Sequence, residues 1–256
     1  VMKCLLRLST MVNISAFLKL PVEFHGKCLI YPPSVNEVVG NKDALFYARV
    51  LSTSQEEIED MYREKGIEEE PMTPLEHLLG SAYRSPKMAE KIKKAFYFFL
   101  REPVQFLYEE KAIVVGDIKE TLKITNDIGK LRIIKEDEFF DFQNSIRAAM
   151  GEKEIEPPDP DEDPRVKRIK AKARYRDKIK AKKGMGLKLN STLISICCMG
   201  LGLNPLNIGE ISYASIPALI RYYQDKDKYE IDVQSLLAGA DSKKVKPKYW
   251  IRNIED

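Results

Sequence analysis

A segment in the second half of the chain changes the sign of its charge, and this segment limits how the rest can fold. Residues 152–164 hold seven acids, one lysine and four prolines, whereas residues 165–188 hold twelve lysines or arginines against one acid. Proline lacks the amide hydrogen and fixes φ, so the acidic part cannot form a regular helix or a central strand. We therefore expect one folded unit before this segment and a second, shorter unit after it.

Four parts of the chain follow from this division, and 256 residues are enough for two hydrophobic cores. We expect an N-terminal domain over residues 1–151, an acidic linker over 152–164, a basic helix over 165–188 and a helical C-terminal domain over 189–256. The N-terminal domain has 21 basic and 23 acidic residues, and residues 165–256 have 20 basic and 9 acidic ones. The basic part suits an acidic partner or nucleic acid, but neutralisation by the acidic linker is the simpler explanation.

The apolar pattern of the N-terminal domain predicts an α+β fold that is mainly α-helical. A small hairpin is expected from an extended run that starts at residue 13, turns at His25-Gly26 and returns over residues 27–31. Ser34 followed by Glu37 has the spacing of a capping box, and Thr73-Pro74 is a typical helix start. The predicted helices cover residues 34–52, 55–65, 74–83, 86–101 and 136–150, and short β runs cover 104–108, 112–115 and 131–134.

Helices are also predicted for the second half of the chain. The basic segment should be helical over residues 165–183, because lysine, arginine and alanine favour helices. A buried helix is expected over 187–201, an amphipathic helix over 208–224 in which Pro217 makes a kink or a break, and a last short helix over 232–239. The tail that follows holds the only tryptophan of the chain, Trp250.

No group of residues has the pattern of a catalytic, cofactor or metal site. The chain has two histidines, His25 and His77, and neither has a zinc-binding spacing or a partner for nucleophilic catalysis. Gly200-Leu-Gly202 lacks the third glycine of a dinucleotide loop, and the acidic run has too many prolines for a calcium loop. We therefore predict a protein that is not an enzyme, with no catalytic residue, no cofactor and no metal.

The cysteine pattern and the hydropathy of the chain bear on where it works. Four cysteines, two of them adjacent in an apolar segment, form no disulfide framework, which is typical of a reduced intracellular protein. No apolar run reaches the length of about 18 residues that a membrane span requires, so no membrane partner is expected.

Three segments resemble a known group of proteins. They are Lys19-Leu-Pro-Val22 with Leu29-Ile-Tyr-Pro-Pro-Ser34, then Asn207-Ile-Gly-Glu-Ile-Ser-Tyr213, and the tail from Asp232 to Ile254. They resemble proteins encoded among the tail-morphogenesis genes of bacteriophages and prophages of Gram-positive bacteria, some of which resemble tail assembly chaperones. The middle of the chain matches only in layout, and the basic helix departs from the group.

The resemblance implies a role without chemistry. Tail assembly chaperones keep the long, helical tape measure protein soluble while the tail tube polymerises around it, so the expected partners are the tape measure or the tail tube protein. The expected location is the host cytoplasm. One alternative is a structural component of the tail or baseplate that stays in the virion, and another is a nucleic-acid-binding protein that uses the basic helix.

Two sets of residues are candidates for contacting a partner. The first set lies in the tail and comprises Leu236, Leu237, Tyr249 and Trp250, although these side chains also suit simple packing of the C-terminal core. The second set lies in the basic helix and comprises Arg168, Lys172 and Arg176. The basic helix has a single aromatic residue and no base-reading motif, so contact with nucleic acid would rest on phosphates alone.

Overall fold

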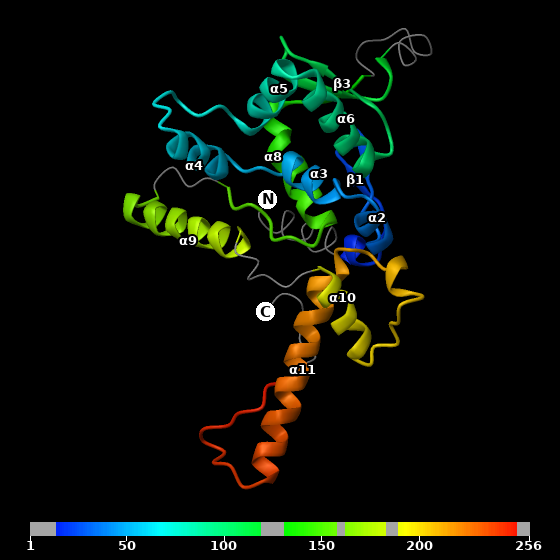
Figure 1. The fold of residues 1–256 in the computed structure, drawn as a ribbon, viewed down its shortest axis with the longest axis vertical. Coiled ribbons are helices and arrows are strands. Elements are labelled where there is room, and N and C mark those ends of the chain that lie inside the picture. Colours follow the sequence, from blue (N-terminus) through cyan, green and yellow to red (C-terminus); the bar gives the residue numbers. More distant parts are fainter. Residues whose placement is uncertain (1–13, 119–130, 158–161, 183–188, 250–256) are drawn as a thin grey trace.

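The computed structural model describes residues 14–118, 131–157, 162–182 and 189–249 (Figure 1). The fold is α+β and mainly helical, with one antiparallel sheet of two strands and another of three. The predicted fold class is thus confirmed.

The N-terminal unit opens on the expected hairpin. Strand β1 (Val22–Phe24) pairs with β2 (Cys28–Ile30), and His25 and Gly26 between them have φ values of 47° and 68°. Two successive positive φ values are the geometry of the tight turn whose twist matches that of a hairpin. The extended run predicted from residue 13 is wrong, because residues 14–17 form a helical turn. That turn ends at Lys19, whose φ of 59° does not continue a right-handed helix.

Five helices follow the hairpin within this part of the chain. They are α2 (Val35–Gly40), α3 (Ala44–Leu51), α4 (Gln55–Lys65), α5 (Pro74–Arg84) and α6 (Pro86–Leu100). The predicted capping box begins α2 at Ser34, and α5 begins at Thr73-Pro74 as predicted, with a capping box at Thr73 that was not predicted. The single helix predicted over residues 34–52 is wrong, because the chain turns between α2 and α3. There the Asn41 side chain accepts a hydrogen bond from the Asp43 amide (3.0 Å), which favours a turn over a continuing helix.

The three-stranded sheet and its last helix complete this unit. Strands β3 (Val104–Leu107), β4 (Ala112–Val115) and β5 (Arg132–Ile134) pair in that order, and α8 (Glu136–Ala149) follows. The core lies between α3, α5, α6, α8 and the strands, and its largest fully buried side chains include Phe96, Phe99, Phe139 and Phe142.

The remaining elements are α9 (Pro164–Lys182), α10 (Leu189–Cys198), a 3₁₀ turn η2 (Ile208–Glu210) and α11 (Ser215–Leu237). The basic helix is confirmed up to Lys182, and the rest of the basic segment, residues 183–188, lies outside the described residues. The two helices predicted over 208–224 and 232–239 are wrong, because α11 is continuous. Pro217 lies in the first turn of α11, where its missing amide would have no partner in any case, so it causes no kink. The prediction of a buried α10 is also wrong in part, because Ile194 is 66% exposed.

A second, smaller core joins the C-terminal elements to the start of α2. Val35 is buried together with Ile196, Ile208 and Ile216. From this core α11 extends away from the other helices, and the chain after α11 returns along it (Figure 1). The division into an N-terminal and a C-terminal domain stays a prediction.

Candidate functional site

The two histidines lie in surroundings without catalytic geometry. His25 stacks on Phe24, with ring centroids 4.3 Å apart, and its Nδ1 lies 3.7 Å from a carboxylate oxygen of Glu138. His77 is half-buried on α5, and burial together with the charges of Arg84 and Lys65 lowers its pKa. Within the ranges that the structure describes, no three His, Cys, Asp or Glu side chains are placed to hold a metal ion.

The one fully buried cysteine that the structure describes is not a reactive thiol. Burial raises the pKa of Cys28 to about 12, although Arg132 and Lys27 act in the opposite direction. A thiol becomes a nucleophile or a metal ligand only as a thiolate, so Cys28 stays protonated and packs as a small apolar residue.

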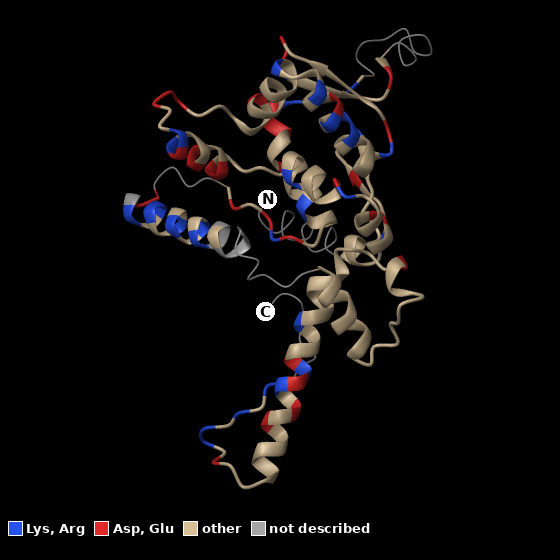
Figure 2. Ribbon diagram, viewed as in Figure 1, with Lys and Arg blue, Asp and Glu red and all other residues tan. Residues whose placement is uncertain are grey.

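The inner face of the basic helix is neutralised by acidic side chains. Lys170 Nζ lies 2.6 Å from a carboxylate oxygen of Glu162. Arg174 Nε donates to the Asp60 carboxylate (2.8 Å), and its guanidinium also pairs with Glu56. Figure 2 shows the resulting arrangement, with the basic α9 beside the acidic α4. The acidic linker thus shares the neutralisation with α4, a partner that the sequence did not indicate.

The outer face of α9 carries the second set of predicted residues. Arg168, Lys172 and Arg176 recur every four residues, so they share one face of the helix. All three are exposed, and none of them forms an ion pair with a residue in the described ranges. Ile169 and Tyr175 flank them and are 67% and 57% exposed. This face is therefore available to an anionic partner.

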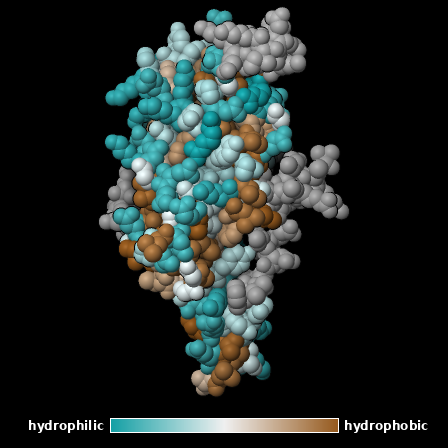
Figure 3. Space-filling model, turned by 90° about the vertical axis from the view of Figure 1, so that its right-hand side faces the viewer, coloured by the Kyte–Doolittle hydropathy of each residue, from teal (hydrophilic) through white to brown (hydrophobic). Residues whose placement is uncertain are grey.

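The distal end of α11 carries the first set of predicted residues. The ring of Tyr249 packs edge-on against that of Tyr229, with centroids 5.6 Å apart, so the returning chain lies against the helix. Leu236 is half-buried, whereas Leu237 is 84% exposed. Figure 3 shows hydrophobic surface at this tip. Trp250 lies outside the described residues. We call the end of α11, where Leu236 and Leu237 lie, the α11 tip.

The structure does not bring the two predicted sets together. The basic face belongs to α9, which lies at the side of the molecule beside α4, whereas the α11 tip projects at its lower end (Figure 1). The two sets are therefore separate surfaces that would contact different partners or different parts of one partner.

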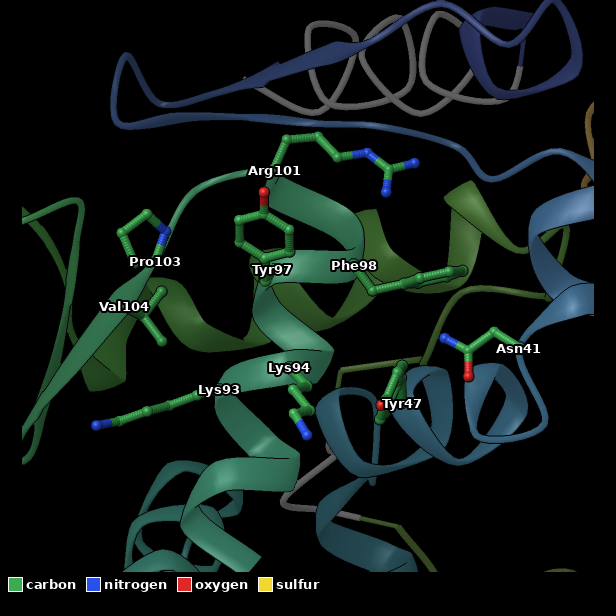
Figure 4. Close-up of a pocket in the computed structure, with 9 residues that line it drawn as sticks. All are labelled: Asn41, Tyr47, Lys93, Lys94, Tyr97, Phe98, Arg101, Pro103 and Val104. Atoms are coloured by element: carbon green, nitrogen blue, oxygen red, sulfur yellow. The ribbon is translucent and has the colours of Figure 1, made fainter.

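A cavity of about 410 Å³ lies between α3, α6 and the start of β3 (Figure 4). It is lined by Asn41, Tyr47, Lys93, Lys94, Tyr97, Phe98, Arg101, Pro103 and Val104. Its cationic groups do not converge on one point. Lys93 Nζ lies 5.6 Å from the centre of the Phe106 ring, and Arg101 is held by Glu37 and lies over the Phe98 ring. This cavity has no set of groups aimed at a single ligand.

A larger groove lies between α5 and β3, and sequence reasoning missed it. Its volume is about 730 Å³, and its lining is apolar and aromatic with an acidic end. The lining residues are Met72, Glu76, Leu79, Gly80, Tyr83, Phe106, Leu107, Tyr108, Glu109, Glu110 and Lys111. We call it the α5–β3 groove. The alternation of Phe106 and Tyr108 was a signal for it, but only tertiary packing places these residues opposite α5.

Comparisons with known proteins identify no relative. No protein-family profile matches the chain, no curated protein is similar to it in sequence, and no solved structure is similar to it in fold. Among the helices of the described ranges, none is long and apolar enough to cross a membrane.

Proposed function

We propose that this chain is a non-enzymatic protein of bacteriophage tail morphogenesis, of the tail assembly chaperone kind, that binds the tape measure protein. It acts in the host cytoplasm and is absent from the finished virion. The proposal starts from the resemblance of three segments of the chain to proteins encoded among phage tail-morphogenesis genes.

The observation that carries the proposal is a contact between two of these three segments. Ser34 and Ser212 form an isolated antiparallel bridge, although 178 positions separate them. The Val35 amide donates to the Ile211 carbonyl (3.0 Å), and the Tyr213 amide donates to the Pro33 carbonyl (2.9 Å). Two stretches that resemble the same group of proteins thus belong to one structural junction. This favours a shared fold over a chance likeness of short sequences.

The α11 tip suits the binding of a helical partner. The exposed Leu237 side chain and the half-buried Leu236 beside it offer an apolar surface at the end of a projecting helix, and such surfaces mark sites of protein contact. A tape measure protein presents long amphipathic helices before the tail tube encloses it. Burial of their apolar faces against the α11 tip would keep them from aggregating.

Mass spectrometry of purified virions tests this proposal against the structural alternative. A chaperone leaves before the tail is complete, so its peptides should be missing from mature particles and present in the lysate. Recovery of the chain from virions, in a fixed ratio to the tail tube protein, would favour the structural role. A long helical reading frame immediately downstream of the gene would add support.

A second candidate function rests on the outer face of α9. Because Lys170 and Arg174 are already neutralised, the helix is held with Arg168, Lys172 and Arg176 exposed. Such a row suits a phosphate backbone, and binding to it would weaken steeply with salt. Titration of duplex DNA at several salt concentrations tests this function. Wild type should lose affinity as salt rises, and replacement of the three cations by glutamine should weaken binding and make its dependence on salt shallower.

A further inference from the structure

The α5–β3 groove runs along an unpaired edge of the three-stranded sheet. It touches the last two residues of β3 (Phe106 and Leu107) and the turn that follows, but no residue of β4. Successive side chains of a strand point to opposite faces, so a space that meets both residues reaches the backbone edge between them. Because β3 is the end strand in the order β3-β4-β5, that backbone edge has no neighbouring strand among the described residues.

The pattern of hydrogen bonds between β3 and β4 shows which backbone groups of β3 face this edge. The Gly116 amide donates to the Pro103 carbonyl (2.8 Å), so these two residues form a pair of the hydrogen-bonded type. Such pairs alternate along an antiparallel ladder, so the next pairs are Gln105 with Val114 and Leu107 with Ala112. The N–H and C=O of Phe106 therefore point away from β4.

The pairing of β4 with β5 follows the same alternating pattern of hydrogen bonds. Ile133 lies opposite Val114, so its carbonyl should point away from β4, and it accepts a hydrogen bond from Lys27 Nζ (2.6 Å). The corresponding groups of Phe106 have no hydrogen-bond partner in the described part of the chain. Proteins usually cover or disrupt such an edge, and here it opens into a groove.

The walls of the groove indicate the side chains that would enter it. Leu79 and Met72 line its α5 side, and the rings of Tyr83 and Tyr108 meet edge-on with centroids 5.3 Å apart. Tyr83 is 73% exposed, and aromatic residues with Met are enriched in protein interfaces. Glu109 and Glu110, at the turn after β3, are exposed and form no ion pair with a described residue. The charge at this end suits a lysine or an arginine.

We propose that the α5–β3 groove binds an extended segment of a partner protein, which adds to the sheet as a fourth strand beside β3. The segment has apolar side chains at alternate positions, which pack against Leu79, Tyr83 and Phe106, and a basic residue at the end that lies beside Glu109 and Glu110. Main-chain hydrogen bonds to Phe106 fix its register. This site is separate from the α11 tip and does not depend on the function proposed above.

The test uses fluorescence anisotropy of the full chain with a panel of short labelled peptides. Each peptide alternates threonine with valine, leucine or phenylalanine, and ends in either lysine or glutamate. We expect lysine-ended members to bind. N-methylation of the alternate amides that would face β3 should weaken binding about tenfold, whereas N-methylation of the other amides should have little effect.

Variants of Gly80 test the location of the site without removing any contact. Gly80 lies within α5 and lines the groove, and a β-carbon there would come 3.4 Å from the flexible Arg84 side chain. Gly80→Leu should fill the groove and weaken binding at least tenfold, whereas Gly80→Ala, the matched control, should bind like wild type. Both changes favour the helix, so loss of binding would not reflect unfolding.

Charge reversal tests the acidic end. Glu109→Lys together with Glu110→Lys should shift the preference from lysine-ended to glutamate-ended peptides, and Glu90→Lys on the exposed side of α6 should not. The proposal is overturned if no member of the panel binds. It is also overturned if binding is indifferent to N-methylation or survives Gly80→Leu unchanged.

Discussion

The side-chain amide of Asn36 occupies the space that a β-carbon on residue 209 would need. A β-carbon built on Gly209 would lie 2.1 Å from Asn36 Oδ1, far inside van der Waals contact. Asn36 Nδ2 also donates to the Glu210 carboxylate (3.0 Å). A side chain on residue 209 would therefore displace the exposed Asn36 side chain and break its hydrogen bond to Glu210.

Gly209→Ala should consequently destabilise the junction between α2 and η2. We expect the free energy of unfolding to fall by about 0.5–1.5 kcal/mol, the usual net contribution of a hydrogen bond, because Asn36 loses its bond to Glu210. Gly40→Ala is the matched control, because a β-carbon at that helical position meets no atom within 4 Å. The control should be neutral or stabilise by about 0.5–1 kcal/mol. Urea unfolding of both variants measures the difference, and equal stabilities would contradict the close approach.

Removal of a cation should lower the stability of the fold more on the inner face of α9 than on its outer face. Arg174→Ala leaves the Asp60 carboxylate, whose side chain is 9% exposed, with Arg63 as its remaining ion-pair partner among the described residues. We expect a loss of about 1–3 kcal/mol, the cost of leaving a buried polar group poorly satisfied. Arg168→Ala on the outer face should change stability by less than about 0.5 kcal/mol.

Limited proteolysis reports on the same helix and on the predicted division of the chain. Acidic, proline-rich sequence cannot order itself by burying apolar surface, so trypsin should cut first between residues 151 and 188. The N-terminal fragment should still melt cooperatively. Arg174→Ala should speed this cleavage, whereas Lys172→Gln should not. Equally fast cutting throughout residues 34–150 would refute the two-unit organisation.

His77 should make stability depend on pH below neutrality. Burial and the charges of Arg84 and Lys65 hold its pKa below 6.5, so the unfolded chain takes up a proton at a higher pH than the folded chain does. The contribution of neutral His77 to the free energy of unfolding is then complete above pH 6.5, and it falls as the pH drops toward the pKa of His77 in the folded chain. His77→Gln should flatten the decline between pH 6.5 and about 5, above the range in which carboxylates titrate. His25→Gln is the control, and an unchanged slope in the His77 variant would disprove the link.

Variants of Trp250 and of the lysines before it test whether the tail acts through apolar packing or through its positive charge. Large-to-small changes of buried aromatic residues cost about 3–5 kcal/mol, and exposed charges contribute only tenths each. Trp250→Ala should therefore weaken the C-terminal unit or its partner contact far more than joint replacement of Lys243, Lys244 and Lys246 by glutamine. Thermal melting and pull-down with tail proteins measure both effects. The opposite order would support the nucleic-acid function.

Local signals in the sequence predicted the start of most helices, and long-range contacts decided the rest. Ser34 with Glu37 and Thr73 with Glu76 satisfy the first amides of their helices within three residues, so the sequence alone locates these caps. Pro217 was misread, because a proline in a long apolar pattern suits either a break or a first turn. The packing of Ile216 into the second core places the first turn there.

The positions of the candidate surfaces also depend on long-range contacts that local sequence signals do not reveal. Arg168, Lys172 and Arg176 recur every four residues, so the sequence is enough to put them on one face of a helix. Which face of α9 stays exposed depends on Asp60, more than a hundred residues earlier in the chain. The α5–β3 groove could not be located from the alternation of Phe106 and Tyr108 alone, because it exists only once α5 packs beside the edge of β3.

Co-expression with the tape measure protein tests the proposed function most directly. The chain and a phage tape measure protein are produced together. The soluble fraction of the tape measure protein is measured with wild type, with Leu237→Asp at the α11 tip and with Lys243→Asp as the control. We predict that wild type and the control keep the tape measure protein soluble and co-purify with it, and that Leu237→Asp does neither. A tape measure protein that is equally insoluble with and without the wild-type chain would contradict the account.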